Sequence, residues 1–398
     1  MEKSELQILS GVKILSFTQF LLGPAAVQYL SDMGADVIKI EPPGTGAWER
    51  TWSGADAFVN GVSVFYLLAH RNVRSLTLNL KHAEGKSIAR RLVGDADVIV
   101  QNFRPGVMEK LGLGYEDVKE INPRIIYASA SGYGKDSPYR DLPGQDLLLE
   151  AISGMMSITG QAGEMPVAPG AAVVDQHGAA LLAMGILAAL FHRARTGEGQ
   201  EIDVTMLQSA IDLQMEPMEY FLNGATVERP REALGSAYHP APYGVYSTKD
   251  GHIVLSLSPM RAVREALGGV AELAPYDDPT LAMSKREEIR KALGPFFTDM
   301  STNEALALLQ SHDVWCARVN NYEQVFADPK VRFLDPVMEI VHPEAGRVRL
   351  IKHPVRYGAG EPGLRCVPPA LGENSGEILE ELGLSADKIA ELRMGGVI

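Results

Sequence analysis

The sequence predicts an α/β protein with a parallel, doubly wound sheet and a separate small α+β domain. In the N-terminal part, short β-favouring apolar runs alternate with longer helical patterns, a rhythm typical of parallel sheets covered by helices. The composition then changes at 223–236, and residues 243–258 have the pattern of a β-hairpin. A chain of 398 residues is long enough for both domains.

The strands of the predicted sheet are short and are separated by helices or loops. They are expected at 12–17, 36–41, 74–80, 97–103, 124–129 and 201–204. Helices are expected at 25–33, 83–93, 107–122, 147–158, 177–195 and 205–222, and the third of these has a break at Gly112–Gly114.

The middle and the end of the chain predict smaller elements. The hairpin at 243–258 turns at Asp250-Gly251, a typical two-residue turn. Short helices are expected at 262–267, 284–293 and 303–312. A second hairpin at 337–351 and a last helix at 375–382 complete the expected elements.

Composition and charge exclude several classes of protein. A hydrophobic content of 46% and a charged content of 22% are typical of soluble globular proteins, and a net charge of −13 argues against general nucleic-acid binding. The two cysteines, Cys316 and Cys366, form neither a disulfide framework nor a metal cluster. The first residues lack the apolar region of a signal peptide, and the most apolar run, 179–191, is too short to cross a bilayer. We therefore expect a cytoplasmic protein without a membrane partner.

One segment of this acidic chain is basic. Between Arg71 and Lys110 there are eight Lys or Arg against four Asp or Glu, a net charge of +4. This local charge predicts an anionic ligand. The alternative, a solvated helix face, accounts equally well for Lys86, Arg90 and Arg91.

The most informative stretch runs over 125–151 and reads as a strand, a loop and a helix. The loop contains Gly132 and Gly134, which allow the backbone to approach a ligand at the carboxyl end of the strand. Asp146 stands at the expected N-cap of the helix, where the helix dipole favours the ionised carboxylate. Such a carboxylate is a candidate nucleophile, although capping the helix is the commoner role of Asp at this position.

The usual nucleotide and metal motifs are missing. Gly44-Thr45-Gly46 lacks the third glycine of the dinucleotide fingerprint, which argues against an NAD-dependent oxidoreductase. The sequence contains no P-loop, no HExxH and no GxSxG motif, and the nine histidines do not have metal-ligand spacing. Three other loops are candidates for ligand contacts, although none of them alone indicates a reaction. They are the turn at Gly23-Pro24, the polar turn with Asn102 and Arg104, and the aromatic segment 236–246.

Eight stretches, specific only in combination and in this order, resemble one known family. They are FTQFLLGPAAVQYLSDMGADVIKIEPP, VRSLTLNLK, QNFRPGVMEKLGLGYEDVKEINPRIIYASASGYG, GQDLLLEA, TGEGQEIDVTML, HPAPYGVYSTKDG, NNYEQVFADPKV and PPALGEN. Over nearly its whole length the chain resembles the family III CoA-transferases (CaiB/BaiF type), which include formyl-CoA, carnitine and bile-acid CoA-transferases.

The resemblance implies a Rossmann-like large domain that is built from both ends of the chain. We expect its N-terminal, CoA-binding part at 1–222, a small α+β domain at 223–327, and a C-terminal part at 328–398 that returns to the large domain. The resemblance also implies an interlocked homodimer.

The resemblance assigns roles to individual residues. Asp146 matches the catalytic aspartate of the family. The residues that match CoA contacts, or the loop near the thioester, are Leu78, Lys81, Asn102, Phe103, Arg104, Lys110, Ser131, Gly132, Tyr133 and Gly134. The substrates would be an acyl-CoA and a carboxylic acid, without a metal or a permanently bound cofactor.

The implied reaction moves CoA from an acyl-CoA donor to an acid acceptor through an aspartyl-CoA thioester on Asp146. Backbone N–H groups of Gly132–Gly134 are expected to stabilise the oxyanions. The chain has Leu21 where formyl-CoA transferases have glutamine, and only Gly235-Ser236-Ala237 in place of their glycine-rich run. Both differences argue against oxalate and favour a larger or more apolar acid.

The competing interpretation is an α-methylacyl-CoA racemase, which belongs to the same superfamily. Such enzymes typically have a Gly-His-Asp motif, whereas this chain has Gly144-Gln145-Asp146. No histidine occurs between His82 and His177, so the racemase interpretation lacks its base. A non-catalytic CoA-binding protein is the other alternative, and the presence of Asp146 argues against it.

Overall fold

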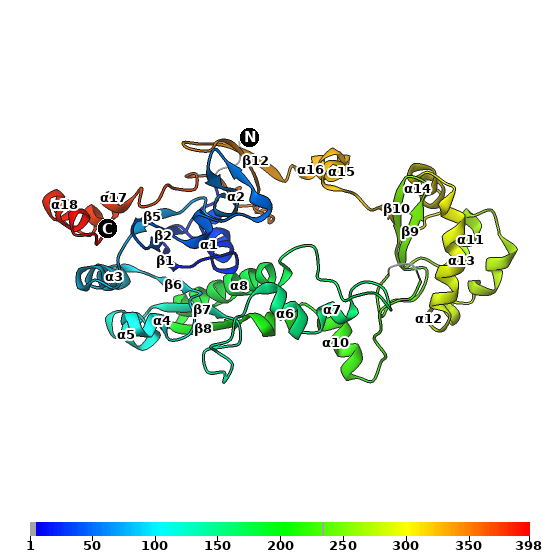
Figure 1. Ribbon diagram of the computed structural model, residues 1–398, viewed down its shortest axis with the longest axis horizontal. Helices are drawn as coiled ribbons and strands as arrows, with labels where there is room; N and C mark the ends of the chain where they lie inside the picture. Colours follow the sequence, from blue (N-terminus) through cyan, green and yellow to red (C-terminus); the bar gives the residue numbers. More distant parts are fainter. Residues whose placement is uncertain (1–4, 233–234) are drawn as a thin grey trace. The chain divides into compact units, whose positions relative to one another are not determined.

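The computed structural model describes residues 5–232 and 235–398, and the chain forms two compact units (Figure 1). The larger unit combines the residues up to Leu149 with Ala172–Leu213 and Asp335–Ile398. The smaller unit combines Glu150–Ala171 with Gln214–Leu334. These boundaries differ from the domain limits expected from the sequence, and the division at 222 and 327 stays a prediction.

The larger unit is built on a six-stranded sheet in the order β5-β2-β1-β6-β7-β8. Every neighbouring pair is parallel, which confirms the predicted sheet type. The strands are β1 (Lys13–Phe17), β2 (Asp36–Glu41), β5 (Arg74–Thr77), β6 (Val98–Gln101), β7 (Ile126–Ser131) and β8 (Gln200–Thr205). The order reverses between β1 and β6, and ligands of doubly wound folds bind at the carboxyl ends of the strands at this point.

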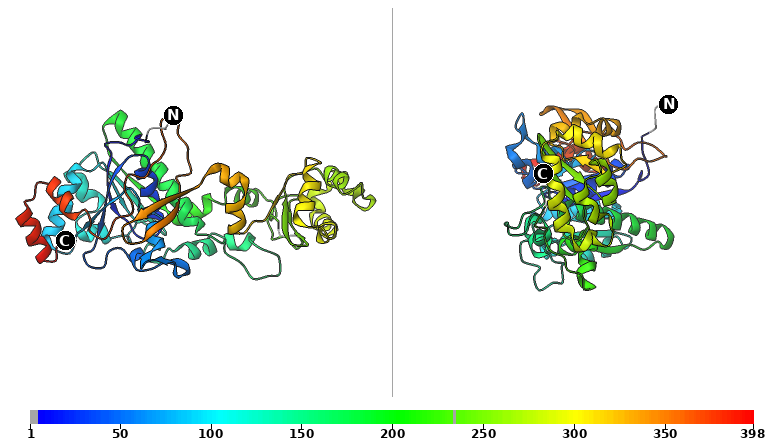
Figure 2. Two further views of the ribbon diagram at one scale, coloured as in Figure 1. Left: turned by 90° about the horizontal axis from the view of Figure 1, so that it is seen from above. Right: turned by 90° about the vertical axis from the view of Figure 1, so that its right-hand side faces the viewer.

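Helices cover both faces of the sheet (Figure 2) because alternate strand residues point to opposite sides. Ile14 packs in a core with the helices α1 (Leu22–Asp32) and α8 (Val173–Thr196). Its neighbour Leu15 packs in the opposite core, which includes residues of α3 (Ala83–Asp95), α5 (Tyr115–Ile121), α17 (Ser375–Glu381) and α18 (Ala386–Met394). The C-terminal helices therefore belong to the larger unit.

Several predicted helices are interrupted or begin elsewhere. The break at Gly112 is confirmed, because α4 (Val107–Leu111) ends there at a φ of +70° and α5 follows. The helix expected at 147–158 is two helices, α6 (Asp146–Ile152) and α7 (Met155–Ile158), because Gly154 between them has a φ of +85°. Likewise 205–222 is divided into α9 (Met206–Asp212) and α10 (Met215–Leu222). The helix α1 begins before Gly23-Pro24, so these residues lie in its first turn and not in the preceding loop.

The helix α8 is longer than expected and begins at Val173. Among the described residues, α8 is the one helix whose length and mean hydropathy of 1.6 would allow it to cross a membrane. The sequence did not indicate this, because its apolar run at 179–191 is shorter than the helix. Buried core helices of soluble proteins meet the same criterion, and α8 packs closely against α1. A Cβ atom on Gly178 would lie 2.6 Å from the Leu22 side chain.

The smaller unit contains the predicted hairpin, formed by β9 (Gly244–Thr248) and β10 (Gly251–Leu255) in antiparallel pairing. A third strand that the sequence did not predict, β11 (Cys316–Arg318), pairs with β10 and is only three residues long. The core of the unit includes Tyr246, Ile253 and Phe297. Its other elements include α7, α10, α11 (Met260–Ala266), the 3₁₀ segment Ala271–Asp277, α12 (Leu281–Ser284), α13 (Arg286–Thr298), α14 (Thr302–Gln310), α15 (Tyr322–Ala327) and α16 (Pro329–Leu334).

Short elements complete the larger unit. The predicted second hairpin is confirmed as β12 (Val337–His342) and β13 (Gly346–Ile351). The helix α17 agrees with the expected last helix, but α18 follows it. The remaining elements are the strands β3 (Phe58–Val59) and β4 (Val62–Ser63), the helix α2 (Val64–Leu67) and the 3₁₀ turns Trp48–Arg50 and Gly54–Asp56.

Candidate active site

The carboxyl ends of β1 and β6 are joined by the side chain of Asn102. The N–H of Gln19 donates to Asn102 Oδ1 and Asn102 Nδ2 donates to the carbonyl of Gln19, both at 2.8 Å. A Cβ atom on Gly23 would lie 2.7 Å from Thr18 and 3.1 Å from Asn102. The Asn102 amide, expected to contact CoA, therefore holds the loop between β1 and α1 in this structure.

The loop after β7 is shaped by its own hydrogen bonds. The N–H of Gly134 donates to Ser131 Oγ at 3.1 Å, and the carbonyl of Gly132 accepts the N–H of Leu207 at the start of α9 at 3.0 Å. Gly134 has a φ of +89°, which a residue with a side chain rarely adopts. The N–H of Gly134, one of the expected oxyanion donors, is therefore engaged with Ser131.

This loop packs directly against the residues that precede Asp146. A Cβ atom on Gly144 would lie 2.4 Å from the Cα of Gly132, so only glycine allows the two backbones to approach so closely. The hydroxyl of Tyr133 donates to the carbonyl of Pro143 at 3.3 Å. These contacts bring Asp146 to the carboxyl end of β7.

Asp146 is the first residue of α6 and not its N-cap, which corrects the expectation from the sequence. The carbonyl of Gln145 accepts the N–H of Leu149, so Gln145 is the capping residue. The Asp146 carboxylate contacts a different helix: its Oδ1 accepts the N–H of Asp175 at 2.8 Å. This N–H belongs to the first turn of α8, where Ala172 offers no side-chain cap. Asp146 thus satisfies an N–H group of α8 and lies at the positive end of its dipole.

Asp175 is the second carboxylate of the site, and sequence reasoning missed it. Burial raises the pKa of its carboxyl to about 7, and the neighbouring charge of Asp146 adds to this increase. Within the described chain, no hydrogen-bond donor contacts the Asp175 carboxylate. The available signal in the sequence was a lone aspartate just before the apolar run of α8, in the position of a first-turn acid. Two carboxylates that share one site are a common catalytic arrangement, because the charge of one can raise the pKa of the other.

The other predicted CoA contacts are spread along the carboxyl edge of the sheet. Lys81 follows β5, whereas Phe103, Arg104 and Lys110 follow β6. The side chains of Lys81, Arg104 and Lys110 are exposed, and Phe103 is half-buried. In the part of the chain that the structure describes, no hydrogen bond or ion pair joins two of these residues.

Leu78 is the predicted contact whose side chain is least accessible. It lies just after β5 and is only 1% exposed, within the core on the α3 face. Its N–H donates to the carbonyl of Glu41 at 2.8 Å. Its side chain therefore packs the core and does not line a surface. Among the described residues, no group of three or more His, Cys, Asp or Glu is arranged to hold a metal ion.

A doubly wound parallel sheet with two carboxylates at its carboxyl edge defines the class of α/β proteins that bind ligands at this edge. Comparison with known proteins identifies the family: the sequence model described as CoA-transferase family III matches residues 9–375. The chain belongs to this family and is a CoA-transferase that moves CoA between acids.

Curated relatives and solved structures agree with this assignment. The chain is 37% identical to an acyl-CoA transferase of Fusarium pseudograminearum, with 98% of this chain and 88% of that protein covered. It is 36% identical to human succinyl-CoA:glutarate CoA-transferase, with 100% and 91% covered. The crystal structure of a CaiB/BaiF family protein from Brucella suis superposes with a TM-score of 0.81 at 30% identity, covering 95% of this chain and 100% of that one. The predicted family and fold type are thereby confirmed.

Proposed function

We propose that this enzyme transfers CoA between dicarboxylic acids longer than oxalate, and that the carboxylate pair Asp146 and Asp175 performs the transfer. The observation that carries the proposal is the 2.8 Å hydrogen bond from the Asp175 N–H to Asp146, which holds the two carboxylates in one site. The substrate class is supported by the name of the human relative, which pairs succinyl-CoA with glutarate. The replacement of the formyl-CoA transferase glutamine by Leu21 also argues against oxalate.

Within the pair, we assign the nucleophile to Asp175, which departs from the assignment of Asp146 expected from the sequence. An oxygen of Asp146 already accepts the Asp175 N–H, whereas the Asp175 carboxylate has no hydrogen-bond donor among the described residues. A pKa of about 7 makes the Asp175 carboxylate more basic than an ordinary aspartate, and basicity increases nucleophilicity. Asp146 then holds the first turn of α8 and raises the pKa of Asp175 by its charge.

The chemistry needs only carboxylates and thioesters. The Asp175 carboxylate attacks the thioester carbonyl of the donor and expels CoA thiolate, which leaves a mixed anhydride. The thiolate attacks the aspartyl carbonyl of the anhydride, releases the donor acid and forms an aspartyl-CoA thioester. The acceptor carboxylate attacks this thioester and again expels the thiolate. Attack of the thiolate on the acceptor acyl carbonyl gives acceptor-CoA and restores Asp175. One thioester replaces another, so no external energy source is required.

The predicted CoA contacts fit a long ligand that lies along the carboxyl edge of the sheet. The cationic residues follow β5 and β6, and the carboxylate pair lies beside the loop after β7. In the order β5-β2-β1-β6-β7, the outermost strands are four spacings apart, or about 19 Å. We therefore place the phosphates of CoA near Lys81, Arg104 and Lys110, and the thioester near Ser131–Gly134 and Asp175.

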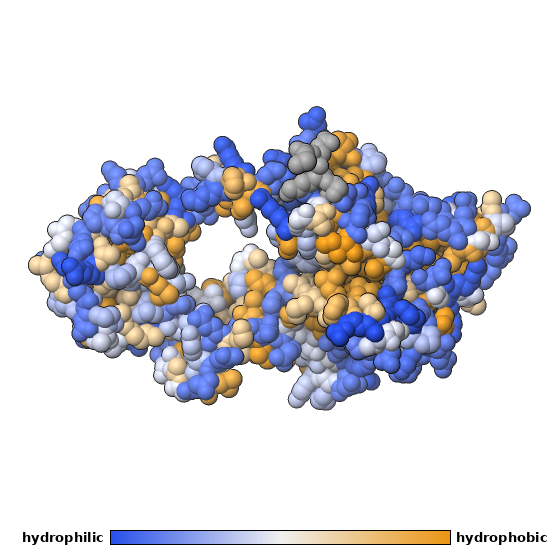
Figure 3. Space-filling view, turned by 180° about the vertical axis from the view of Figure 1, so that it is seen from behind, coloured by the Kyte–Doolittle hydropathy of each residue, from blue (hydrophilic) through white to orange (hydrophobic). Residues whose placement is uncertain are grey.

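We also propose that the enzyme is a cytoplasmic, interlocked homodimer. Apolar side chains, in orange, interrupt the polar surface in the space-filling view (Figure 3). Exposed large apolar residues of the larger unit include Leu147 of α6, 57% exposed, and Met184 and Phe191 of α8, 61% and 65% exposed. Burial of such residues against a second copy would support the homodimer that the family resemblance implies.

The test is a substrate panel with purified enzyme and mass-spectrometric detection of new CoA esters. Succinyl-CoA is offered with glutarate, with other dicarboxylates, with oxalate and with apolar monocarboxylates. We expect new thioesters with dicarboxylates of four or more carbons and none with oxalate. Preferential transfer to oxalate or to apolar acids would contradict the proposed substrate class.

A further inference from the structure

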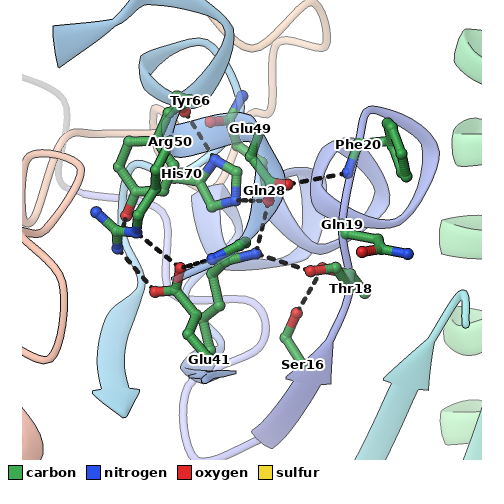
Figure 4. A network of polar contacts seen from close by, with 12 residues as sticks. Ser16, Thr18, Gln19, Phe20, Gln28, Glu41, Glu49, Arg50, Tyr66 and His70 are labelled. Carbon is green, nitrogen blue, oxygen red and sulfur yellow. Dashed lines mark hydrogen bonds and ion pairs between the residues drawn. The ribbon is translucent and has the colours of Figure 1, made fainter. Parts of the chain in front are cut away.

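A buried ion pair between Lys39 and Glu49 holds the loop between β1 and α1, and Figure 4 shows Glu49 beside the backbone of Phe20. The ammonium of Lys39 donates to the carbonyl of Thr18 at 2.8 Å and to Glu49 Oε1 at 3.0 Å. The second oxygen of Glu49, Oε2, accepts the N–H of Phe20 at 3.1 Å. With the two bonds from Asn102 to Gln19, four consecutive polar groups of this loop are held by side chains from three other segments.

The Lys39–Glu49 pair is removed from solvent. Burial of two charges destabilises the folded protein unless well-placed hydrogen bonds compensate for the lost hydration. The side chains of Lys39 and Glu49 are 1% and 0% exposed. Burial alone would raise the pKa of Glu49, but Lys39 and the nearby His70, 3.4 Å away, outweigh burial and hold that pKa well below its usual range. An apolar pair of similar volume would avoid the desolvation of two charges. Stability alone therefore does not explain why charged residues stand here, which points to a role in the geometry of the loop.

The backbone of Phe20 supplies that explanation. Phe20 has a φ of +62°, a left-handed conformation that is unfavourable for a residue with a bulky side chain. Its ring contacts Trp48 with centroids 4.7 Å apart, and Trp48 stacks on Trp52 at the same distance. The three rings are 37–42% exposed. We call Phe20, Trp48 and Trp52 the aromatic ladder.

We propose that Glu49, paired with Lys39, is a positioning residue that fixes Phe20 and the aromatic ladder at the carboxyl end of β1 for binding of the acyl-CoA. Glu49 lies directly after Trp48 in the chain, and its side chain accepts a hydrogen bond from the backbone N–H of Phe20. Glu49 therefore links the backbone segments that carry the two rings. An aromatic ladder held in this way presents a fixed apolar surface near the carboxyl end of β1, where the strand order reverses between β1 and β6. This inference rests on the proposed function, because its kinetic consequence is measured as CoA transfer.

Two double variants separate positioning from stability. Lys39→Met with Glu49→Gln removes both charges and keeps a side-chain oxygen for the N–H of Phe20. Lys39→Met with Glu49→Leu also removes both charges but leaves that N–H without an acceptor. Neither variant contains an unpaired buried charge, so the comparison isolates the hydrogen bond to Phe20. Glu49→Asp, one methylene shorter, carries the test if the leucine variant does not fold, because it keeps the charge but withdraws from Phe20.

The readouts are transfer kinetics and the circular dichroism of the ladder. The only other tryptophan, Trp315, is replaced by Phe throughout, so that the tryptophan exciton couplet in the far ultraviolet reports on Trp48 and Trp52. We expect the leucine variant to raise the KM for acyl-CoA by about tenfold or more and to lose the couplet. The glutamine variant should stay within about threefold of the parent in KM and keep the couplet, as expected from its retained hydrogen bond.

Other outcomes overturn the proposal. Equal KM values and equal couplets in the two variants would show that the acceptor for Phe20 has no positioning role. A loss of thermal stability alone, with unchanged KM for the folded fraction, would assign the pair a purely structural role. If the parent enzyme fails to transfer CoA, the proposed function fails instead, and the couplet still tests whether Glu49 sets the geometry of the ladder.

Discussion

The carboxylate of Asp146 accepts a 2.8 Å hydrogen bond from the backbone N–H of Asp175, 29 residues further along the chain. This contact places the first residue of α6 against the first turn of α8. It brings two carboxylates into one site. The pKa of Asp175 is raised there, mainly by burial and to a smaller extent by the charge of Asp146.

The first prediction assigns the nucleophile. Asp175→Asn should reduce turnover by at least about a thousandfold, because an amide cannot form the anhydride. Asp146→Asn should keep measurable transfer. The measurement is hydroxylamine trapping during turnover, followed by peptide mass spectrometry, which should locate the hydroxamate on Asp175.

The matched pair of asparagine variants provides its own control, since both keep side-chain volume and remove one charge. Circular dichroism and CoA affinity should remain close to those of the parent enzyme in both. A hydroxamate on Asp146, together with activity in Asp175→Asn, would return the nucleophile to Asp146.

The second prediction concerns pH. The pKa of Asp175 is raised to about 7, so its carboxylate is protonated at acidic pH and cannot attack the thioester. The kcat/KM for acyl-CoA should therefore rise with pH through an apparent pKa near 7. In Asp146→Asn the neighbouring negative charge is absent, so the pKa of Asp175 should fall and the rise should move to lower pH. An unchanged profile in this variant would separate Asp146 from the titrating group.

The sequence predicted local features of the site better than its tertiary contacts. The strand, glycine loop and helix around Asp146 were recognisable because their signals lie within one continuous stretch. Asp175 was missed because α8 begins at Val173 without a side-chain cap of its own, and its cap comes from Asp146 through tertiary structure. A helix start without a local cap lacks the strongest signal in the sequence, and the first-turn acid that remains is a weak one.

The same limit applies to the sheet. The parallel pairing followed from the alternation of strands and helices, but the strand order β5-β2-β1-β6-β7-β8 depends on which helices cover which face. The resemblance assigned Leu78 to CoA binding, whereas the structure places its side chain in the core with 1% exposure. The hydrogen bonds of Asn102 to Gln19 likewise depend on the adjacency of β1 and β6 and could not be read from the sequence.

The third prediction tests the basic segment. Replacement of Lys81, Arg104 and Lys110 by Gln should raise the KM for acyl-CoA by roughly tenfold to a hundredfold, as expected for three exposed charge contacts. The kcat should change much less, because contacts to remote phosphates bind substrate and transition state alike. Added salt should raise the KM of the parent enzyme but should have little effect on the triple variant.

The matched control removes three exposed lysines of the smaller unit, Lys249, Lys291 and Lys330, by substitution with Gln. The two triple variants have the same net charge. Only the variant of Lys81, Arg104 and Lys110 should lose affinity for CoA esters. An equal loss in both variants would show that the overall charge of the protein, and not these three residues, determines the affinity.

The last prediction separates CoA transfer from racemisation at the α-carbon. A racemase removes and returns the α-proton of its acyl-CoA and needs a base on each face of that carbon. The chain has no histidine between His82 and His177, and His177 itself lies 2.7 Å from the Asp212 carboxylate. The site therefore offers two carboxylates for attack on a carbonyl, whereas glutamine replaces the racemase histidine in Gly144-Gln145-Asp146. Incubation of a chiral 2-methylacyl-CoA in deuterated water should give no deuterium at the α-carbon, with or without an added acid. Isotopic label from an added dicarboxylate should appear in a new CoA thioester. Deuterium incorporation at catalytic rates that disappears in Asp146→Asn or Asp175→Asn would show that the carboxylate pair also acts as a base.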